Sequence, residues 1–141
     1  MTGTISKDKK LRTEPIPRHR ILREVYRHFY EFEAFVSSTG NHVIDYTYFV
    51  YNDAGEVIDR VPISISFYDL REGIEDESVL SERKRQAVML NVIRDMKQRD
   101  VAEIMGITTV SVGQYVEQAM LQLSEEYFPE DRQEDSDSPS Q

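Results

Sequence analysis

The sequence predicts an α+β fold that is mainly helical, with a C-terminal helix-turn-helix domain preceded by a helix and a β-hairpin. Three observations predict it. Apolar residues recur at three- and four-residue steps over residues 18–37, as in an amphipathic helix. Two β-rich runs flank a turn with a glycine at residues 52–55. Two short helical patterns meet at a glycine within residues 98–117.

The first helix is predicted over residues 18–37. Its apolar residues are spaced for one helical face, and they are Ile21, Leu22, Val25, Tyr26, Phe29, Phe32 and Val36. Gly40 follows and ends the segment. Residues 1–17 are polar and basic and contain Pro15 and Pro17, which predicts a flexible arm.

A β-hairpin is predicted from residues 42–51 and 56–67. Gly55 stands where the connecting turn needs a positive φ. Alternation in the second strand places five apolar residues on one face: Val57, Val61, Ile63, Ile65 and Phe67. Pro62 indicates an edge strand or a break, because proline has no N–H to donate.

Aromatic residues gather in the first of these strands, at Tyr46, Tyr48, Phe49 and Tyr51. Exposed aromatic rings could stack on unpaired bases, or the rings could pack on the neighbouring helix. No Lys or Arg lies between His42 and Ile58. Packing on the helix is therefore the favoured interpretation.

Four parts are predicted along the chain: a flexible basic arm (1–17), a candidate partner-binding region of helix and hairpin (18–78), the helix-turn-helix domain (79–128) and a disordered acidic tail (129–141). Residues 68–78 are typical of an acidic connector with one helical turn. Ser81 is predicted to cap the next helix. The last helix is expected to run to about Tyr127, where Pro129 stops it.

The most specific pattern in the chain surrounds Gly106. Val101 and Met105 are four residues apart and face one way from a first helix. Gly106 lies where that helix must stop and the chain must reverse, which favours the left-handed backbone that glycine adopts cheaply. Thr108 can then cap a second helix. This pattern predicts a helix-turn-helix, whose second helix usually enters the major groove of DNA, with an ordinary helical hairpin as the alternative.

The pattern extends on both sides of the turn. It opens with Leu80-Ser81-Glu82-Arg83-Lys84-Arg85, continues through an apolar helix with Ala87, Val88, Leu90 and Val92, and reaches the block Asp100-Val101-Ala102-Glu103-Ile104-Met105-Gly106-Ile107-Thr108. It closes with Val112, Ala119 and Leu123. In order and spacing, residues 80–124 resemble the fourth conserved region of bacterial sigma factors.

This resemblance implies a domain that binds double-stranded promoter DNA and docks on the flap of the β subunit of bacterial RNA polymerase. Nothing in the chain resembles the sigma region that binds the polymerase clamp and melts DNA. The chain therefore resembles a partial or divergent sigma factor, of the size that phages and mobile elements often encode.

The chain departs from the sigma pattern in its second helix, because no Lys or Arg lies between Thr108 and Leu123. The residues of this helix expected to face DNA are Thr108, Thr109, Val110, Ser111, Gly113, Gln114 and Glu117. Gln114 could read adenine through its amide. Positive charge is expected from the preceding helices, at Arg83, Lys84, Arg85, Arg94, Lys97 and Arg99. Since phosphate neutralisation dominates DNA affinity, we expect weak or assisted binding.

Charge is distributed unevenly along the chain. The net charge is −9, which is wrong for a free-standing nucleic-acid binder. Residues 1–30 hold eight Lys or Arg against three acids, whereas residues 101–141 hold nine acids against one arginine. Such ends are typical of electrostatic interaction arms, although charge at flexible ends also serves solubility alone.

Several classes of protein are excluded or disfavoured. The absence of cysteine excludes disulfides and thiolate metal sites. The apolar runs are too short for a membrane span and no secretory signal is present, so we expect a cytoplasmic protein. The three histidines lack metal-ligand spacing and no glycine-rich phosphate loop appears. We therefore expect no enzyme activity, no cofactor and no small-molecule substrate.

The leading functional prediction is a sigma-like transcription regulator that binds promoter DNA and contacts RNA polymerase. Two alternatives stay open. One is a DNA-packaging protein, similar to a small terminase subunit, or a recombination accessory protein. The other is a helix-turn-helix protein adaptor without DNA binding, which the missing basic residues of the second helix would permit.

Overall fold

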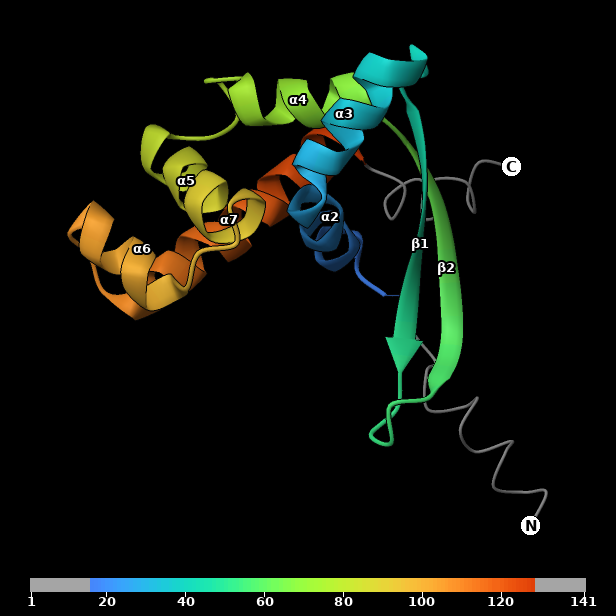
Figure 1. Cartoon of the computed structure of the whole chain (residues 1–141). Coiled ribbons are helices and arrows are strands. Elements are labelled where there is room, and N and C mark those ends of the chain that lie inside the picture. Colours follow the sequence, from blue (N-terminus) through green and yellow to red (C-terminus); the bar gives the residue numbers. More distant parts are fainter. Residues whose placement is uncertain (1–15, 129–141) are drawn as a thin grey trace, which may run out of the picture.

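The structure, a computed structural model, describes residues 16–128. Its elements are α2 (Arg18–Arg27), α3 (Phe29–Thr39), β1 (Val43–Tyr51), β2 (Val57–Ser66), α4 (Phe67–Glu75), α5 (Glu82–Ala87), η1 (Val88–Ile93), α6 (Gln98–Met105) and α7 (Thr109–Tyr127). The helices gather together and the hairpin extends beyond them (Figure 1). The predicted α+β class is confirmed. The predicted tail at 129–141 and nearly all of the predicted arm at 1–17 lie outside the described residues.

Two helices, α2 and α3, stand where one helix was predicted over residues 18–37. The chain turns at His28, which has φ −102° and ψ 20° and whose N–H donates to the Val25 carbonyl at 3.0 Å. α2 packs on α7 and η1, whereas α3 packs on α4. The single-helix prediction is wrong here because neither Pro nor Gly marks the turn, and the apolar spacing continues across it.

β1 and β2 form a two-stranded antiparallel sheet. The predicted turn is confirmed: the Asn52 carbonyl accepts a hydrogen bond from the Gly55 N–H at 3.0 Å, and Gly55 has φ +86°. Pro62 remains within β2, opposite Thr47. With two strands in the described sheet, each strand has an outer edge, and an edge is the position that proline tolerates.

Only the half of the hairpin next to α4 is buried. Ile63 and Ile65 are buried, and Phe67 is buried too, but it begins α4 instead of ending the predicted strand. At the far end Val57 is 40% exposed. No helix covers that end of the hairpin (Figure 1). The face predicted from alternation is therefore buried in its second half alone.

The aromatic residues of β1 divide in the same way. The ring of Tyr46 lies 5.8 Å from that of His28 and 6.4 Å from that of Phe32, between centroids, which confirms packing on the helices for this residue. Phe49 and Tyr51 are 41% and 58% exposed. For these two residues the packing interpretation is wrong, because they lie on the part of the hairpin that extends past the helices.

α4 is longer than the connector with one helical turn predicted over residues 68–78. The Ser66 side chain caps it by accepting a hydrogen bond from the Tyr68 N–H at 3.2 Å. Leu70 and Ile74 are buried on its inner face. The prediction is wrong because the acidic residues between these positions obscured an apolar spacing of three and four residues.

α5 begins at the predicted cap, where the Ser81 side chain accepts a hydrogen bond from the Lys84 N–H at 3.2 Å. The helix widens into η1, and at its end the Arg94 N–H donates to the carbonyl of Met89, five residues earlier. Asn91 is buried here and donates to the Met96 carbonyl at 2.8 Å. This hydrogen bond fixes the connection that leads into α6.

One buried cluster joins the N-terminal and C-terminal elements, and it includes Tyr26 of α2, Phe67 and Leu70 of α4, Val88 of η1 and Leu123 of α7. The Tyr26 hydroxyl donates to the Leu70 carbonyl at 2.7 Å inside this cluster. Residues 18–78 and 79–128 thus share a core. The division of the chain into four parts stays a prediction.

α7, with 19 residues, ends as expected at Tyr127. The Tyr127 hydroxyl donates to Oδ2 of Asp76 at 2.7 Å, and the Ser78 hydroxyl donates to Oδ1 of the same carboxylate at 2.6 Å. These hydrogen bonds from Ser78 and Tyr127 lower the pKa of Asp76. Within residues 16–128, no helix is long and apolar enough to cross a membrane.

Acid is expected to weaken the contact between Asp76 and Tyr127. Because the folded pKa of Asp76 lies below its ordinary value, the stabilisation is fully present above about pH 4 and is lost as the pH falls through the folded pKa. Tyr127→Phe should therefore be less stable than the wild type at neutral pH, and the difference should shrink as the pH falls below about 4. Urea unfolding at several pH values measures it. A difference that is constant with pH would contradict this role for the carboxylate.

Candidate nucleic-acid interface

The connection between α6 and α7 has the geometry predicted for a helix-turn-helix. Gly106 follows α6 with φ 70° and ψ 35°, in the left-handed region, and the Ile107 N–H donates to the Ala102 carbonyl at 3.0 Å. The Thr108 side chain caps α7 by accepting a hydrogen bond from the Ser111 N–H at 3.0 Å. Both predicted roles, the glycine turn and the threonine cap, are confirmed.

A small buried cluster holds α6 across α7, and it consists of Val101, Ala102 and Val112. Partly buried apolar residues surround it, namely Leu90, Met96, Met105 and Ile107. This cluster is separate from the main core. The two helices are therefore fixed relative to each other by their own packing, which presents the first half of α7 to solvent.

The predicted DNA-facing residues of α7 fall into two groups. Thr109, Gln114 and Glu117 are exposed. Thr108 and Ser111 serve the cap, and the Thr108 hydroxyl also donates to the Ser111 hydroxyl at 2.9 Å. These exposed and capping positions all lie in the first half of α7 or at its start.

Gly113 differs from the other predicted residues because it lies against α6. A Cβ atom at this position would lie 3.5 Å from Nε2 of Gln98. Val110, by contrast, is 68% exposed, which is unusual for a valine and leaves its side chain free to contact a thymine methyl group. DNA contact by any of these residues stays a prediction.

The three basic residues of α5 have different surroundings. Arg83 is exposed and has no ion pair or hydrogen bond to a side chain among residues 16–128. Nζ of Lys84 donates to Oε1 of Gln122 on α7 at 2.9 Å. Arg85 is half-buried: its Nε donates to the Ile74 carbonyl at 2.8 Å and its guanidinium also reaches the Leu80 carbonyl at 3.4 Å. Arg83 and Lys84 are thus placed for a ligand, whereas Arg85 connects α5 to α4.

Of the remaining predicted cations, Arg94 is exposed at the end of η1, and the other two are at the start of α6. Lys97 directly precedes the helix and is exposed. The Arg99 side chain is 78% exposed, and its Nε lies 3.9 Å from Oδ1 of Asp100. An exposed pair of this kind contributes little to stability. Both cations are therefore available at the α6 side of the interface, away from those of α5.

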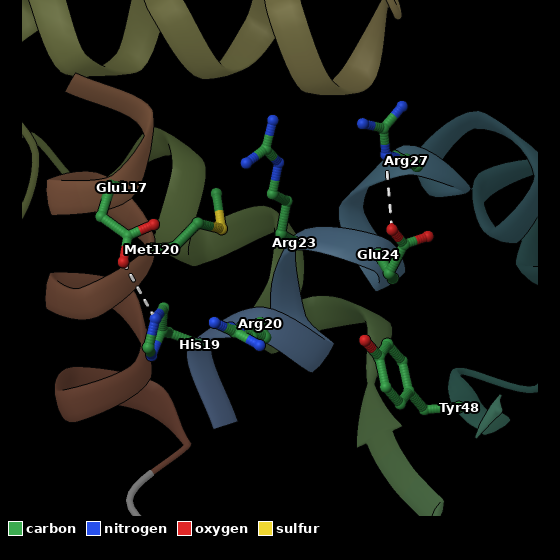
Figure 2. A pocket seen from close by; sticks show the side chains of 8 residues that line it. All are labelled: His19, Arg20, Arg23, Glu24, Arg27, Tyr48, Glu117 and Met120. Atoms are coloured by element: carbon green, nitrogen blue, oxygen red, sulfur yellow. Dashed lines mark hydrogen bonds and ion pairs between the residues drawn. The ribbon is translucent and has the colours of Figure 1, made fainter. Parts of the chain in front are cut away.

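One neighbour of α7 was not predicted from the sequence. α2 packs along α7, and Nε2 of His19 lies 3.1 Å from Oε2 of Glu117 (Figure 2). Arg20 and Arg23 stand on the same helix beside this contact (Figure 2). The surplus of basic residues over residues 1–30 was the feature of the sequence that indicated a positively charged segment here. No periodicity indicates which helix α2 packs against.

The fold and this surface define a helix-turn-helix domain of the kind that places its second helix in the major groove. Residues 78–123 match the family described as sigma-70, region 4. The match covers about a third of the chain and confirms the predicted resemblance over residues 80–124. No curated protein and no solved structure matches the chain.

Sigma-70 region 4 is a DNA-binding domain of transcription regulation, and domains of this family generally bind promoter DNA and RNA polymerase. Residues 78–123 are therefore similar to this class of helix-turn-helix domain.

Proposed function

We propose that the chain is a sigma-like transcription regulator that binds promoter DNA through α7 and acts together with bacterial RNA polymerase. The observation that carries this proposal is the exposed first half of α7, held by a separate small core inside the segment that matches sigma-70, region 4. The described residues offer no arrangement that favours catalysis over this role. We propose a non-enzymatic regulator of phage or mobile-element type.

Assisted binding follows from the charge of α7. No Lys or Arg lies between Thr108 and Leu123, so α7 cannot neutralise phosphates by itself. A contact with polymerase would hold the domain near the promoter and raise its effective concentration there. In region 4 of sigma factors this contact is made with the flap of the β subunit, and we propose the same partner here.

The hairpin is a candidate for a second protein contact. Its far end, which no helix covers (Figure 1), exposes four large apolar side chains: Phe49, Tyr51, Val57 and Ile58. Exposed aromatic and aliphatic side chains in one place are typical of protein-interaction surfaces. This supports the proposal that residues 18–78 include a partner-binding region.

Gln114→Ala tests the base-reading role of α7. We expect it to lower the discrimination between a selected promoter duplex and a scrambled duplex by about 1 to 3 kcal/mol, the range for one bidentate contact to a base. The duplex can be selected from a random library with the polymerase complex, and occupancy is then measured by footprinting. Gln86→Ala removes an exposed glutamine from α5 and serves as the matched control.

Arg83→Ala should give a different result in the same assay. Because phosphate contacts carry no sequence information, it should weaken the binding of both duplexes equally and flatten the salt dependence. Arg85 is left unchanged, since its hydrogen bonds to α4 and to Leu80 make it a structural residue. If neither variant alters promoter occupancy while the polymerase complex stays intact, the domain is a protein adaptor and the DNA-reading role fails.

A further inference from the structure

A cleft of about 500 Å³ lies between α2 and α7, and β1 contributes to its wall. Its lining residues are mainly charged, and among them are His19, Arg20, Arg23, Glu24, Arg27 and Glu117 (Figure 2). Most of these come from α2, which lies outside the segment that matches sigma-70, region 4. The cleft therefore adjoins the DNA-facing residues of α7 and shares Glu117 with them.

Two of the four basic residues in the cleft are already paired. His19 contacts Glu117, and Arg27 contacts Glu24 at 3.7 Å and Asp95 at 2.8 Å. The carboxylates that line the cleft are thus engaged by these two residues. The charge that remains unbalanced in the cleft comes from the other two basic side chains.

The side chains of Arg20 and Arg23 form no hydrogen bond or ion pair with any residue in the 16–128 range. Arg23 is half-buried, and its Nε is inaccessible to solvent and lacks an acceptor in this part of the chain. Removing a guanidinium from water without an anionic partner is unfavourable. Figure 2 shows both arginines between the His19–Glu117 contact and the Glu24–Arg27 pair. This arrangement suits an anion from outside the chain, and guanidinium groups bind phosphate oxygens especially well.

The position of the cleft indicates the source of that anion. Glu117, at its edge, lies three residues after Gln114, so the two are neighbours on the helix surface. A helix in the major groove, which is about 12 Å wide, has a phosphate backbone on each side. α5 contacts α7 through the Lys84–Gln122 hydrogen bond, and α2 contacts it through His19 and Glu117. Gln122 and Glu117 are five residues apart and therefore point in different directions from the helix.

We propose that the α2 cleft binds a backbone phosphate of the duplex whose major groove α7 enters, with Arg20 and Arg23 as its ligands. This inference rests on the proposed function and deepens it. α2 then supplies phosphate contacts that α7, without Lys or Arg in its first turns, does not make itself. An acidic peptide segment has the same charge, but the position of the cleft beside the exposed face of α7 favours DNA as the ligand.

The test compares two double variants of the full chain that lose the same charge. Arg20→Gln with Arg23→Gln removes the cleft ligands, and Arg60→Gln with Arg71→Gln removes two exposed arginines from β2 and α4. Affinity for a duplex of about 20 base pairs is measured by fluorescence anisotropy at several salt concentrations, with polymerase added if the chain alone binds too weakly. The cleft variant should lower the slope of log K against log salt by about one, for one phosphate that is no longer neutralised, and the control should keep the wild-type slope.

A second measurement reports on Arg23 directly. Its Nε–H resonance, assigned in the ¹⁵N-labelled protein by its loss in Arg23→Gln, should shift on titration with the duplex and with inorganic phosphate. A synthetic acidic peptide is the competing probe. A shift with the peptide and none with the duplex would overturn the proposal in favour of a protein ligand.

The outcomes separate this inference from the proposed function. If both double variants flatten the slope equally, the effect is one of net charge and the cleft assignment is overturned. If Gln114→Ala lowers discrimination while the cleft variant keeps the wild-type slope, the cleft proposal fails and the proposed function stands. If the wild type binds no duplex even with polymerase, the cleft proposal and the proposed function both fail, because the chain then does not bind DNA.

Discussion

Leu123→Ala is expected to lower the free energy of unfolding by roughly 2 to 4 kcal/mol, as truncation of a buried aliphatic side chain does. Leu123 is fully buried in the main core. It lies against α4 at Gly73, where an added Cβ atom would come within 2.9 Å of its Cδ2 atom. The cavity would therefore open where α7 packs against α4. Urea unfolding followed by circular dichroism measures the change.

Leu121→Ala is the matched control, because it makes the same chemical change two residues earlier on the same helix. Leu121 is 42% exposed and lies outside both buried clusters. We expect it to cost less than about 1 kcal/mol, since little apolar surface is returned to water. If the two variants unfolded at the same urea concentration, the packing of α7 against α4 would contribute nothing and the assigned core would be wrong.

Arg85→Ala is expected to lower stability by about 2 to 4 kcal/mol, because it leaves two carbonyls without their charged donor. Arg85 Nε donates to Ile74 at 2.8 Å, and its guanidinium reaches Leu80 at 3.4 Å. Both of these residues are buried, so water cannot easily replace the lost hydrogen bonds. The segment between them would lose these two hydrogen bonds to α5. Thermal and urea unfolding both measure this effect.

The neighbouring Arg83 provides the control for this variant. Arg83→Ala removes the same charge from an exposed position and should change stability by less than about 0.5 kcal/mol. It should instead weaken DNA binding, so that loss of Arg83 affects DNA binding and loss of Arg85 affects stability. Equal stability of the two variants would mean that the hydrogen bonds of Arg85 do not hold α4 in place.

The helix-turn-helix could be predicted from the sequence because its determinants are local. The left-handed turn at Gly106 and the cap at Thr108 each depend on one residue type at one position. The hairpin turn at Gly55 is local in the same sense. Ser81 also caps α5 as expected. The resemblance to sigma-70, region 4 added the order of these local signals along residues 78–123.

The features that were missed depend on contacts between distant residues. α4 was predicted as a connector because its apolar spacing is carried by only a few residues among acids, and burial against α7 stabilises it. The break at His28 has no Pro or Gly, and it follows from the different partners of α2 and α3. Tertiary contacts of this kind override local preference.

For the candidate site residues, the sequence shows which side chains are basic but does not show which of them are accessible to a ligand. Arg83 and Arg85 stand two positions apart and are the same residue type, yet one is exposed and the other is bonded to carbonyls. Arg20 and Arg23 were not among the predicted site residues. Their place beside α7 depends on how α2 packs across the core, which periodicity alone does not determine.

Pro62 has a consequence for how the exposed hairpin behaves in a crowded solution. Pro62 pairs with Thr47 of β1 and has no N–H. At this position the outer edge of β2 therefore offers no hydrogen-bond donor to an incoming strand. The outer edge of β2 is therefore interrupted near its middle and is a poor template for sheet extension. The chain can keep Phe49 and Tyr51 in water on this hairpin with less risk that copies of the protein polymerise edge to edge along β2. Replacing this one proline by a β-branched residue would complete the edge and remove that protection.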